Sequence, residues 1–477
     1  MSRSRLFSLA IFAFPIAAAA AQQPARPSAS AIDIPFQKYV LPNGLTVVLA
    51  ENHATPLVAV EMMYHVGSKN EVVGRTGFAH MFEHVMFTGS GHVPYGLHDK
   101  YTEGVGGGNN GTTSFDWTLY YETIPSNYLE TALWLESDRM GFLLDSLDEA
   151  KFRAQRDIVK NERRERTDNI PYARDYEIVA NILYPKNHPY SWPTIGSMAD
   201  LSNATVEDVK RFFRLYYAPN NATLVIVGDF DSAKTKTWIT KYFGDLPKGA
   251  PIVRPRIGGH ALTAEKRITF EDRVQVPQLT INWPSVGVKS DDQPALDVLS
   301  DVLGNTRVAR INKALVYDKQ TAASIVVFQN PIEDAGQFQV IATPRPGHTL
   351  TELEAQIDSL IDQIKREGPT ADELKRVKAG QQRSFFENLE TNYGKMRQMA
   401  DDQTFFNDPS HSWRVSYPKT QAVTPDDVKR VANKYLGKTR IVLSTVPVGK
   451  TDLAANASMS TVVTDPFTEK TATEVRP

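Results

Sequence analysis

The chain has 477 residues, carries a formal charge of −2 and contains no cysteine. A charge this close to neutral does not suggest a nucleic-acid or anionic-membrane partner. Without disulfides the chain must be stabilised by large apolar cores, and its length is enough for two or three domains.

Residues 1–21 have the pattern of a secretory signal peptide. Arg3 and Arg5 precede an apolar stretch over residues 6–20, and the alanines at 19–21 form a small-residue cleavage site. This apolar stretch is short for a membrane span. We therefore predict export to a bacterial periplasm, with no membrane span after cleavage. The alternatives are a retained N-terminal anchor and secretion to the outside.

After a hairpin-type turn at Pro42-Asn43-Gly44, residues 77–87 (GFAHMFEHVMF) predict an apolar helix that also carries His80, Glu83 and His84. Residues four apart lie on one helix face, so the two histidines can bind one metal ion. Glu83 flanks that face, in the inverted order H-x-x-E-H. The alternative is a set of core histidines, but three polar groups in one apolar turn are costly to bury without partners.

The glycine-rich run at residues 104–111 (GVGGGNNG) contains the spacing G-x-G-x-x-G, which is typical of dinucleotide-binding loops. Such a loop needs a strand before it and a helix after it. The residues that follow, TTSFDWTLYYETI, alternate and are rich in threonine and aromatic residues, which predicts a strand. We therefore exclude nucleotide binding at this run.

Residues 151–166 (KFRAQRDIVKNERRER) predict a helix in which Gln155 and Glu162 share one stripe with two aliphatic residues. A catalytic zinc site needs a third protein ligand besides two histidines, and Glu162 lies where an inward-facing carboxylate would be. Helical spacing alone does not choose Glu162 over Glu165.

The chain contains two similar halves. Residues 205–211 with the following YYAPNNATLVIVGDF resemble residues 424–430 with the following KYLGKTRIVLSTVPV, and each predicts a capped helix followed by a strand. Long helical patterns also run over 128–144, 147–167 and 371–402. We predict an α+β fold of two homologous two-layer domains, each a sheet with helices on one face. The predicted bounds are 33–247 and 265–450, with a linker over 247–264 and a flexible tail over 451–477.

Three segments, in this order, resemble the pitrilysin-like zinc metallopeptidases, the inverzincin family of insulin-degrading enzyme and mitochondrial processing peptidase. They are VGSKNE with GFAHMFEHVMF, then NNGTTSFDWTLYYETIP, then QRDIVKNERRE. The resemblance covers roughly residues 33–450 and weakens in the second half. It implies a bacterial two-domain form that makes half of a clamshell.

By this resemblance His80, His84 and Glu162 bind one zinc ion per chain, and Glu83 is the general base. Zinc would lower the pKa of its bound water toward ~7 and polarise the scissile carbonyl. Glu83 would take the water proton and deliver it to the leaving amine. The family often has a second glutamate seven residues before the third ligand, where this chain has Gln155; an amide can hydrogen-bond to a ligand but adds no negative charge.

The resemblance also implies that a peptide substrate adds to the strand beside the zinc through main-chain hydrogen bonds. The matching residues are Asn110, Gly111, Thr112 and Thr113. The alternative for Asn110 is a turn residue without a binding role.

The second half holds only His260, His348 and His411, without paired spacing, so a second metal site is not expected there. The family usually presents in this half an Arg and a Tyr, seven residues apart, that stabilise the developing oxyanion. This chain has Val316 and Ala323 at those positions, and neither side chain donates a hydrogen bond.

We therefore expect a zinc endopeptidase that acts as the zinc-bearing subunit of a heterodimer, whose partner supplies the Arg/Tyr pair. One alternative is a non-catalytic assembly or binding subunit, like the family's core proteins in respiratory complexes. Another is a self-sufficient homodimer in which other residues replace the pair.

Overall fold

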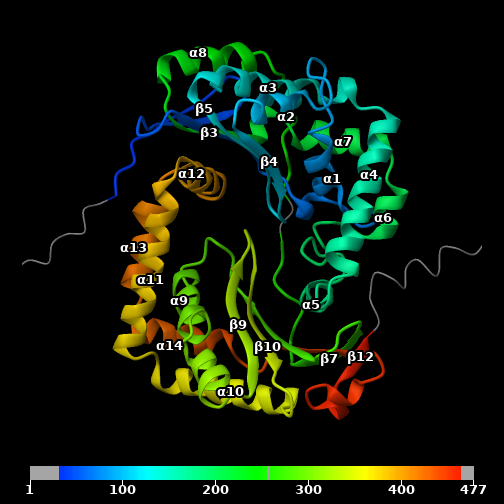
Figure 1. Cartoon of the computed structure of the whole chain (residues 1–477), viewed down its shortest axis with the longest axis vertical. Coiled ribbons are helices and arrows are strands. Elements are labelled where there is room, and N and C mark those ends of the chain that lie inside the picture. The colour runs from blue at the N-terminus through cyan, green and yellow to red at the C-terminus, as the bar shows by residue number, and fades with distance from the viewer. Residues whose placement is uncertain (1–31, 255–256, 464–477) are drawn as a thin grey trace, which may run out of the picture. The chain divides into compact units, whose positions relative to one another are not determined.

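The computed structural model describes residues 32–254 and 257–463 (Figure 1). The predicted signal peptide at 1–21 and residues 464–477 of the predicted tail lie outside the described residues. Within the described part of the chain, no helix combines the length and apolarity needed to cross a membrane.

The first sheet has six strands in the order β1-β2-β6-β3-β5-β4. Neighbouring strands are antiparallel except β2 and β6, which are parallel. The predicted turn at 42–44 connects β1 to β2, whereas the strand predicted after the glycine run is two strands, β4 and β5, with a turn between them. The strands are β1 (Gln37–Val40), β2 (Thr46–Glu51), β3 (Leu57–Tyr64), β4 (Gly108–Thr113), β5 (Thr118–Pro125) and β6 (Ala222–Gly228).

The described residues of this half form eight helices: α1 (Phe78–Val85), α2 (Leu97–Glu103), α3 (Leu129–Ser146), α4 (Glu149–Arg163), α5 (Asp175–Leu183), α6 (Met198–Asn203), α7 (Val206–Tyr216) and α8 (Ser232–Phe243). A single π-helical turn, residues 164–168, extends α4. Apolar side chains of α1, α3, α4, α7 and α8 form one buried core with the sheet. The predicted helices at 128–144 and 147–167 correspond to α3 and α4.

The second sheet has the order β12-β7-β11-β8-β10-β9. Its strands are β7 (Lys266–Asp272), β8 (Gln278–Ser285), β9 (Ala322–Pro331), β10 (Gly336–Pro344), β11 (Ile441–Pro447) and β12 (Thr461–Val463). Its helices are α9 (Gln293–Leu303), α10 (Leu350–Glu367), α11 (Ala371–Glu390), α12 (Asn392–Phe406), α13 (Tyr417–Ala422) and α14 (Pro425–Tyr435). The predicted α+β class with two sheets is confirmed.

Two boundaries differ from the prediction. The helix predicted over 371–402 is two helices, because the Thr391 hydroxyl accepts the Gly394 N–H and starts α12. The flexible tail predicted over 451–477 is wrong for residues 451–463, because Thr461 to Val463 form β12 and pair in parallel with β7.

The two halves repeat one chain path. Strands β2, β6, β3, β5 and β4 correspond to β7, β11, β8, β10 and β9 in sheet order. In each half a helix precedes the edge strand (α1 or α9), and two long helices follow the edge hairpin (α3 and α4, or α10 and α11). Helices α9 and α11 therefore take the topological places of α1 and α4.

Each sheet also contacts a helix from the other half, which the sequence did not predict. Helix α12 packs on β3 and β6, and α5 packs on β8 and β11. Alternate residues of β3 point in opposite directions: Val60 and Met62 enter the first core, whereas Glu61 pairs with Arg397 of α12 at 2.7 Å. The sheet is therefore covered on both faces where α12 crosses it.

A buried charge cluster joins the halves. The ammonium of Lys69, which is 3% exposed, lies 2.8 Å from Asp116 and also pairs with Glu333, in the turn between β9 and β10. The same Glu333 contacts His65 at 2.7 Å and the half-exposed Lys289 at 3.0 Å. Because these carboxylates are buried, Lys69 is needed to compensate their charge.

We expect Lys69→Ala to destabilise the chain by about 3–5 kcal/mol, because Asp116 and Glu333 would lose their buried partner. Lys289→Ala is the matched control, since Lys289 contacts the same carboxylate from a half-exposed position, and it should cost less than about 1 kcal/mol. Chemical denaturation measures both variants. Equal losses of stability in the two variants would mean that the burial of Lys69 does not determine how much its ion pairs stabilise the chain.

Candidate metal centre

Helix α1 is anchored at its first turn by Glu71. The Glu71 carboxylate accepts the backbone N–H groups of Gly77 and Ala79, each at 2.9 Å. Gly77 has φ of +89°, and a Cβ there would lie 2.7 Å from the Ile195 carbonyl oxygen. Both the backbone angle and the space at this position therefore require glycine.

The apolar face of α1 fixes the direction of its polar residues. Phe78, Met81, Phe82 and Val85 are buried in the first core. The Tyr120 hydroxyl of β5 donates to the Phe82 carbonyl at 3.1 Å. With this face buried, the histidines point away from the core and toward α4, which lies beside α1 (Figure 1).

His80, His84 and Glu162 meet between α1 and α4. The Nε2 atoms of His80 and His84 lie 3.6 Å and 3.1 Å from one oxygen, Oε2, of Glu162. One ligand atom from each residue lies within 4.8 Å of the others. Glu165, which the sequence could not separate from Glu162, is exposed.

The charges of this group suit a divalent cation. Burial lowers the pKa of His80 to about 4, so its imidazole is neutral at neutral pH. The hydrogen bond with His84 lowers the pKa of Glu162, and the Arg166 guanidinium lies 2.6 Å from its other oxygen. Glu162 Oε2 is buried, and among the described residues it faces only these two imidazoles. Two imidazoles and one carboxylate are the donor set of catalytic zinc sites.

Glu83 faces the edge strand β4. A Cβ at Gly111 would lie 3.0 Å from Glu83 Cγ, so a larger residue would push the strand away from α1. Burial raises the pKa of the Glu83 carboxyl, and the nearby Thr113 hydroxyl opposes this shift. Asn110 and Thr112, which alternate with Gly111 on β4, are exposed.

Other predicted residues lie apart from this group. Gln155 is half-buried on α4, and no hydrogen bond joins it to a histidine within the described chain. Val316 packs against the second core, and Ala323 is exposed on β9. Sequence reasoning missed the anchoring role of Glu71, because it lies seven residues before the first residue of α1 and outside any short capping motif.

A second group combines His98, Glu122 and Glu136, and all three are buried. His98 belongs to α2, and its Nε2 atom lies 3.2 Å from the Glu122 carboxylate. Arg139 pairs with Glu136 and lies 4.4 Å from the Tyr120 ring centroid. Burial raises the pKa of Glu136 to about 7 and also raises that of Glu122. Since Arg139 compensates one carboxylate, a single proton neutralises the group, which fits a structural role beneath β5.

Comparisons with known proteins show which family the chain resembles. The profile "Insulinase (Peptidase family M16)" matches residues 46–187, and "Peptidase M16 inactive domain" matches residues 203–381. The chain is 34% identical over 363 residues to the zinc protease PqqE of Helicobacter pylori, covering 74% of this chain and 80% of that protein. It is 22% identical over 421 residues to mitochondrial-processing peptidase subunit beta of Lentinula edodes, covering 83% of this chain and 86% of that protein.

Among solved structures, a protease from Helicobacter pylori superposes with a TM-score of 0.81 at 31% identity, covering 87% of this chain and 100% of that chain.

We expect Glu162→Gln to bind much less zinc than the wild-type chain, because an amide cannot supply the anionic oxygen that faces both imidazoles. Glu165→Gln, three residues away on the exposed side, should bind as much zinc as the wild type. Zinc content after dialysis against a weak chelator measures both variants. Loss of zinc in Glu165→Gln alone would contradict this ligand set.

Proposed function

This chain belongs to the M16 peptidase family, and on that premise we propose that it is a zinc-dependent endopeptidase acting on extended peptides. The carrying observation is the convergence of His80, His84 and Glu162 beside Glu83 and the edge strand β4. The zinc protease name of the Helicobacter pylori relative supports the choice of metal.

His80, His84 and Glu162 would hold one zinc ion per chain. Zinc in such a donor set lowers the pKa of water and polarises a carbonyl group. The geometry supports this assignment, since the imidazoles of His80 and His84 face one oxygen of Glu162. Arg166 holds the second Glu162 oxygen and so fixes the carboxylate.

Glu83 would move the proton in the reaction. It accepts a proton from the attacking water and returns it to the leaving amine nitrogen, so no covalent enzyme intermediate forms. Its raised pKa suits this exchange, because a carboxyl group with a pKa nearer to neutrality both accepts and releases a proton readily.

The substrate would lie as an added strand along β4. This strand ends the first sheet, so one of its edges is not paired within the sheet. Main-chain groups of Asn110, Gly111, Thr112 and Thr113 are offered to an extended peptide, which would pass directly beside Glu83. This mode favours unfolded segments over folded proteins.

We further propose that the chain is the zinc-bearing subunit of a heterodimer. Val316 and Ala323 supply no donor for the developing oxyanion, so a related partner chain would supply an Arg/Tyr pair. The similarity to a mitochondrial-processing peptidase beta subunit supports an assembly with a second subunit. The predicted export signal supports a periplasmic location.

One observation favours the self-sufficient homodimer as a second candidate. The Arg307 guanidinium lies 4.9 Å from the ring centroid of Tyr317, and both side chains are exposed. This pair lies close to Val316 and offers an arginine and a tyrosine hydroxyl as donors. Removal of either donor would then lower turnover.

We expect Glu83→Gln to retain zinc and to lose at least about 10²-fold in turnover, because an amide cannot accept the water proton. Zinc content and cleavage of an unstructured quenched peptide measure the two properties separately. Substantial residual turnover with zinc bound would remove Glu83 from this role.

We expect the purified mature chain to contain zinc, to cleave the same peptide poorly, and to gain activity when a related chain with an Arg/Tyr pair is added. Native mass spectrometry reports the assembly. Robust turnover by the chain alone, reduced in Arg307→Gln and Tyr317→Phe, would instead establish the homodimer.

A further inference from the structure

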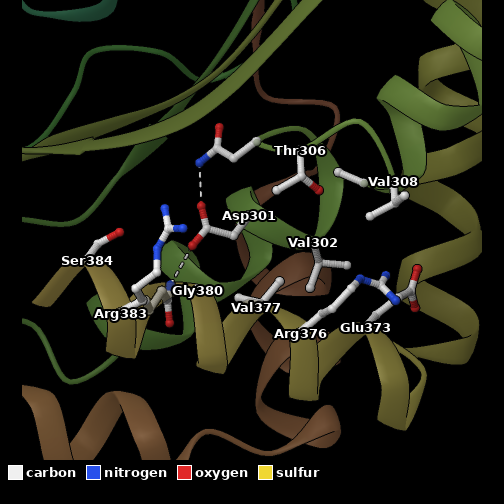
Figure 2. A pocket seen from close by; sticks show the side chains of 13 residues that line it. Asp301, Val302, Thr306, Val308, Glu373, Arg376, Val377, Gly380, Arg383 and Ser384 are labelled. Atoms are coloured by element: carbon white, nitrogen blue, oxygen red, sulfur yellow. Dashed lines mark hydrogen bonds between the residues drawn. The ribbon is translucent and has the colours of Figure 1, made fainter. Parts of the chain in front are cut away.

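The second half has a cavity in the place that the metal centre has in the first half. Helices α9 and α11 correspond to α1 and α4, and a cavity of about 530 Å³ lies between them. Figure 2 shows side chains from both helices facing this cavity. None of its lining residues is a histidine, so its chemistry differs from that of the metal centre.

Two arginines of α11 line the cavity. Arg376 and Arg383 are seven residues apart, which places them on one helix face about 10 Å apart along the axis. Gly380 lies between them, and a Cβ built there has no atom within 4 Å. The helix surface between the arginines is therefore open.

The two guanidinium groups differ in whether a nearby carboxylate already neutralises their charge. Arg376 makes no ion pair with any residue that the structure describes, because the neighbouring Glu373 carboxylate is taken by Arg310 at 2.7 and 2.8 Å. Arg383 lies 3.4 Å from the exposed Glu387. Arg376 is thus the cation of this cavity that is available to a ligand.

The remaining carboxylate of the cavity does not cancel Arg376. Asp301 accepts the side-chain amides of Gln381, at 2.6 Å, and of Asn305. Burial raises the pKa of Asp301, which disfavours its charged form. Val302, Val308 and Val377 add an apolar lining beside these groups (Figure 2).

We propose that this cavity binds the C-terminal end of a short peptide, with the α-carboxylate on Arg376 and an apolar terminal side chain against Val302 and Val377. A carboxylate matches the planar donors of a guanidinium, and the open surface at Gly380 admits the peptide main chain. Arg383 supports the bound anion from the other end of the gap. That the ligand is a peptide rests on the proposed function; the capture of a carboxylate does not.

The test compares acetyl-Ala-Ala-Leu as the free acid and as the C-terminal amide. Binding is measured by calorimetry on the full mature chain with zinc bound and with Glu83→Gln, which prevents cleavage. We expect the free acid to bind at least about tenfold more tightly than the amide, because only the acid offers an anion to Arg376.

Three variants in the same background locate the site. Arg376→Gln should lower the affinity for the acid at least about tenfold, and Arg383→Gln should lower it less. Gly380→Leu should abolish binding by filling the open turn, while making α11 more stable because leucine favours helix over glycine. Lys375→Gln, on the same helix but outside the cavity, is the control and should bind as the wild type does.

Equal binding of acid and amide, no binding, or an acid preference that survives in Arg376→Gln and Gly380→Leu would each overturn the proposal. The peptidase assignment is tested separately by turnover. If that assignment is wrong, turnover will not depend on zinc or on Glu83. The calorimetric preference for the acid is read independently of turnover.

Discussion

A single carboxylate oxygen of Glu162 faces the Nε2 atoms of both histidines, at 3.6 Å and 3.1 Å, and the first half of the chain is arranged around that contact. The histidines belong to α1 and the carboxylate to α4, so the two helices must dock in one relative rotation. Rotating α1 by one residue would turn His80 by about 100° toward the core. The apolar face of α1 prevents this, because Met81, Phe82 and Val85 are buried against the sheet.

The surrounding contacts hold α1 and the edge strand β4 in place around these three side chains. Glu71 holds the first turn of α1, and Tyr120 holds the Phe82 carbonyl from β5. Gly111 lets the edge strand approach Glu83 to van der Waals distance. The three candidate metal ligands, Glu83 and a strand edge therefore come together, as the proposed hydrolysis by positioned groups requires.

The two halves follow one chain path but differ in the side chains that lie between corresponding helices. In the first half the space between two corresponding helices is lined by imidazole and carboxylate groups; in the second it is lined by Arg376, Arg383 and valines. The halves interlock through α5 and α12 and through the buried Lys69 cluster. The halves therefore differ in the side chains between these helices, whereas the order of strands and helices is shared.

The sequence predicted the features that depend on neighbours along the chain. The histidine spacing, Glu83 and the repeated helix–strand units are local patterns. The choice of Glu162 over Glu165 depends on how α4 docks, and the need for Gly111 depends on its distance from Glu83; neither is local. Strand β12 was missed because its three residues pair with a strand almost 200 residues earlier. The break at Thr391 was missed because the helical pattern continues through it.

The proposed function depends most on zinc-dependent hydrolysis at His80, His84 and Glu162. The direct measurement is to isolate the mature chain with whatever partner it forms, remove the metal, and follow cleavage of an unstructured peptide as zinc is added back. We predict that activity rises in proportion to zinc and levels off at one zinc per copy of this chain. Activity in the metal-free protein, or a plateau at another ratio, would contradict it.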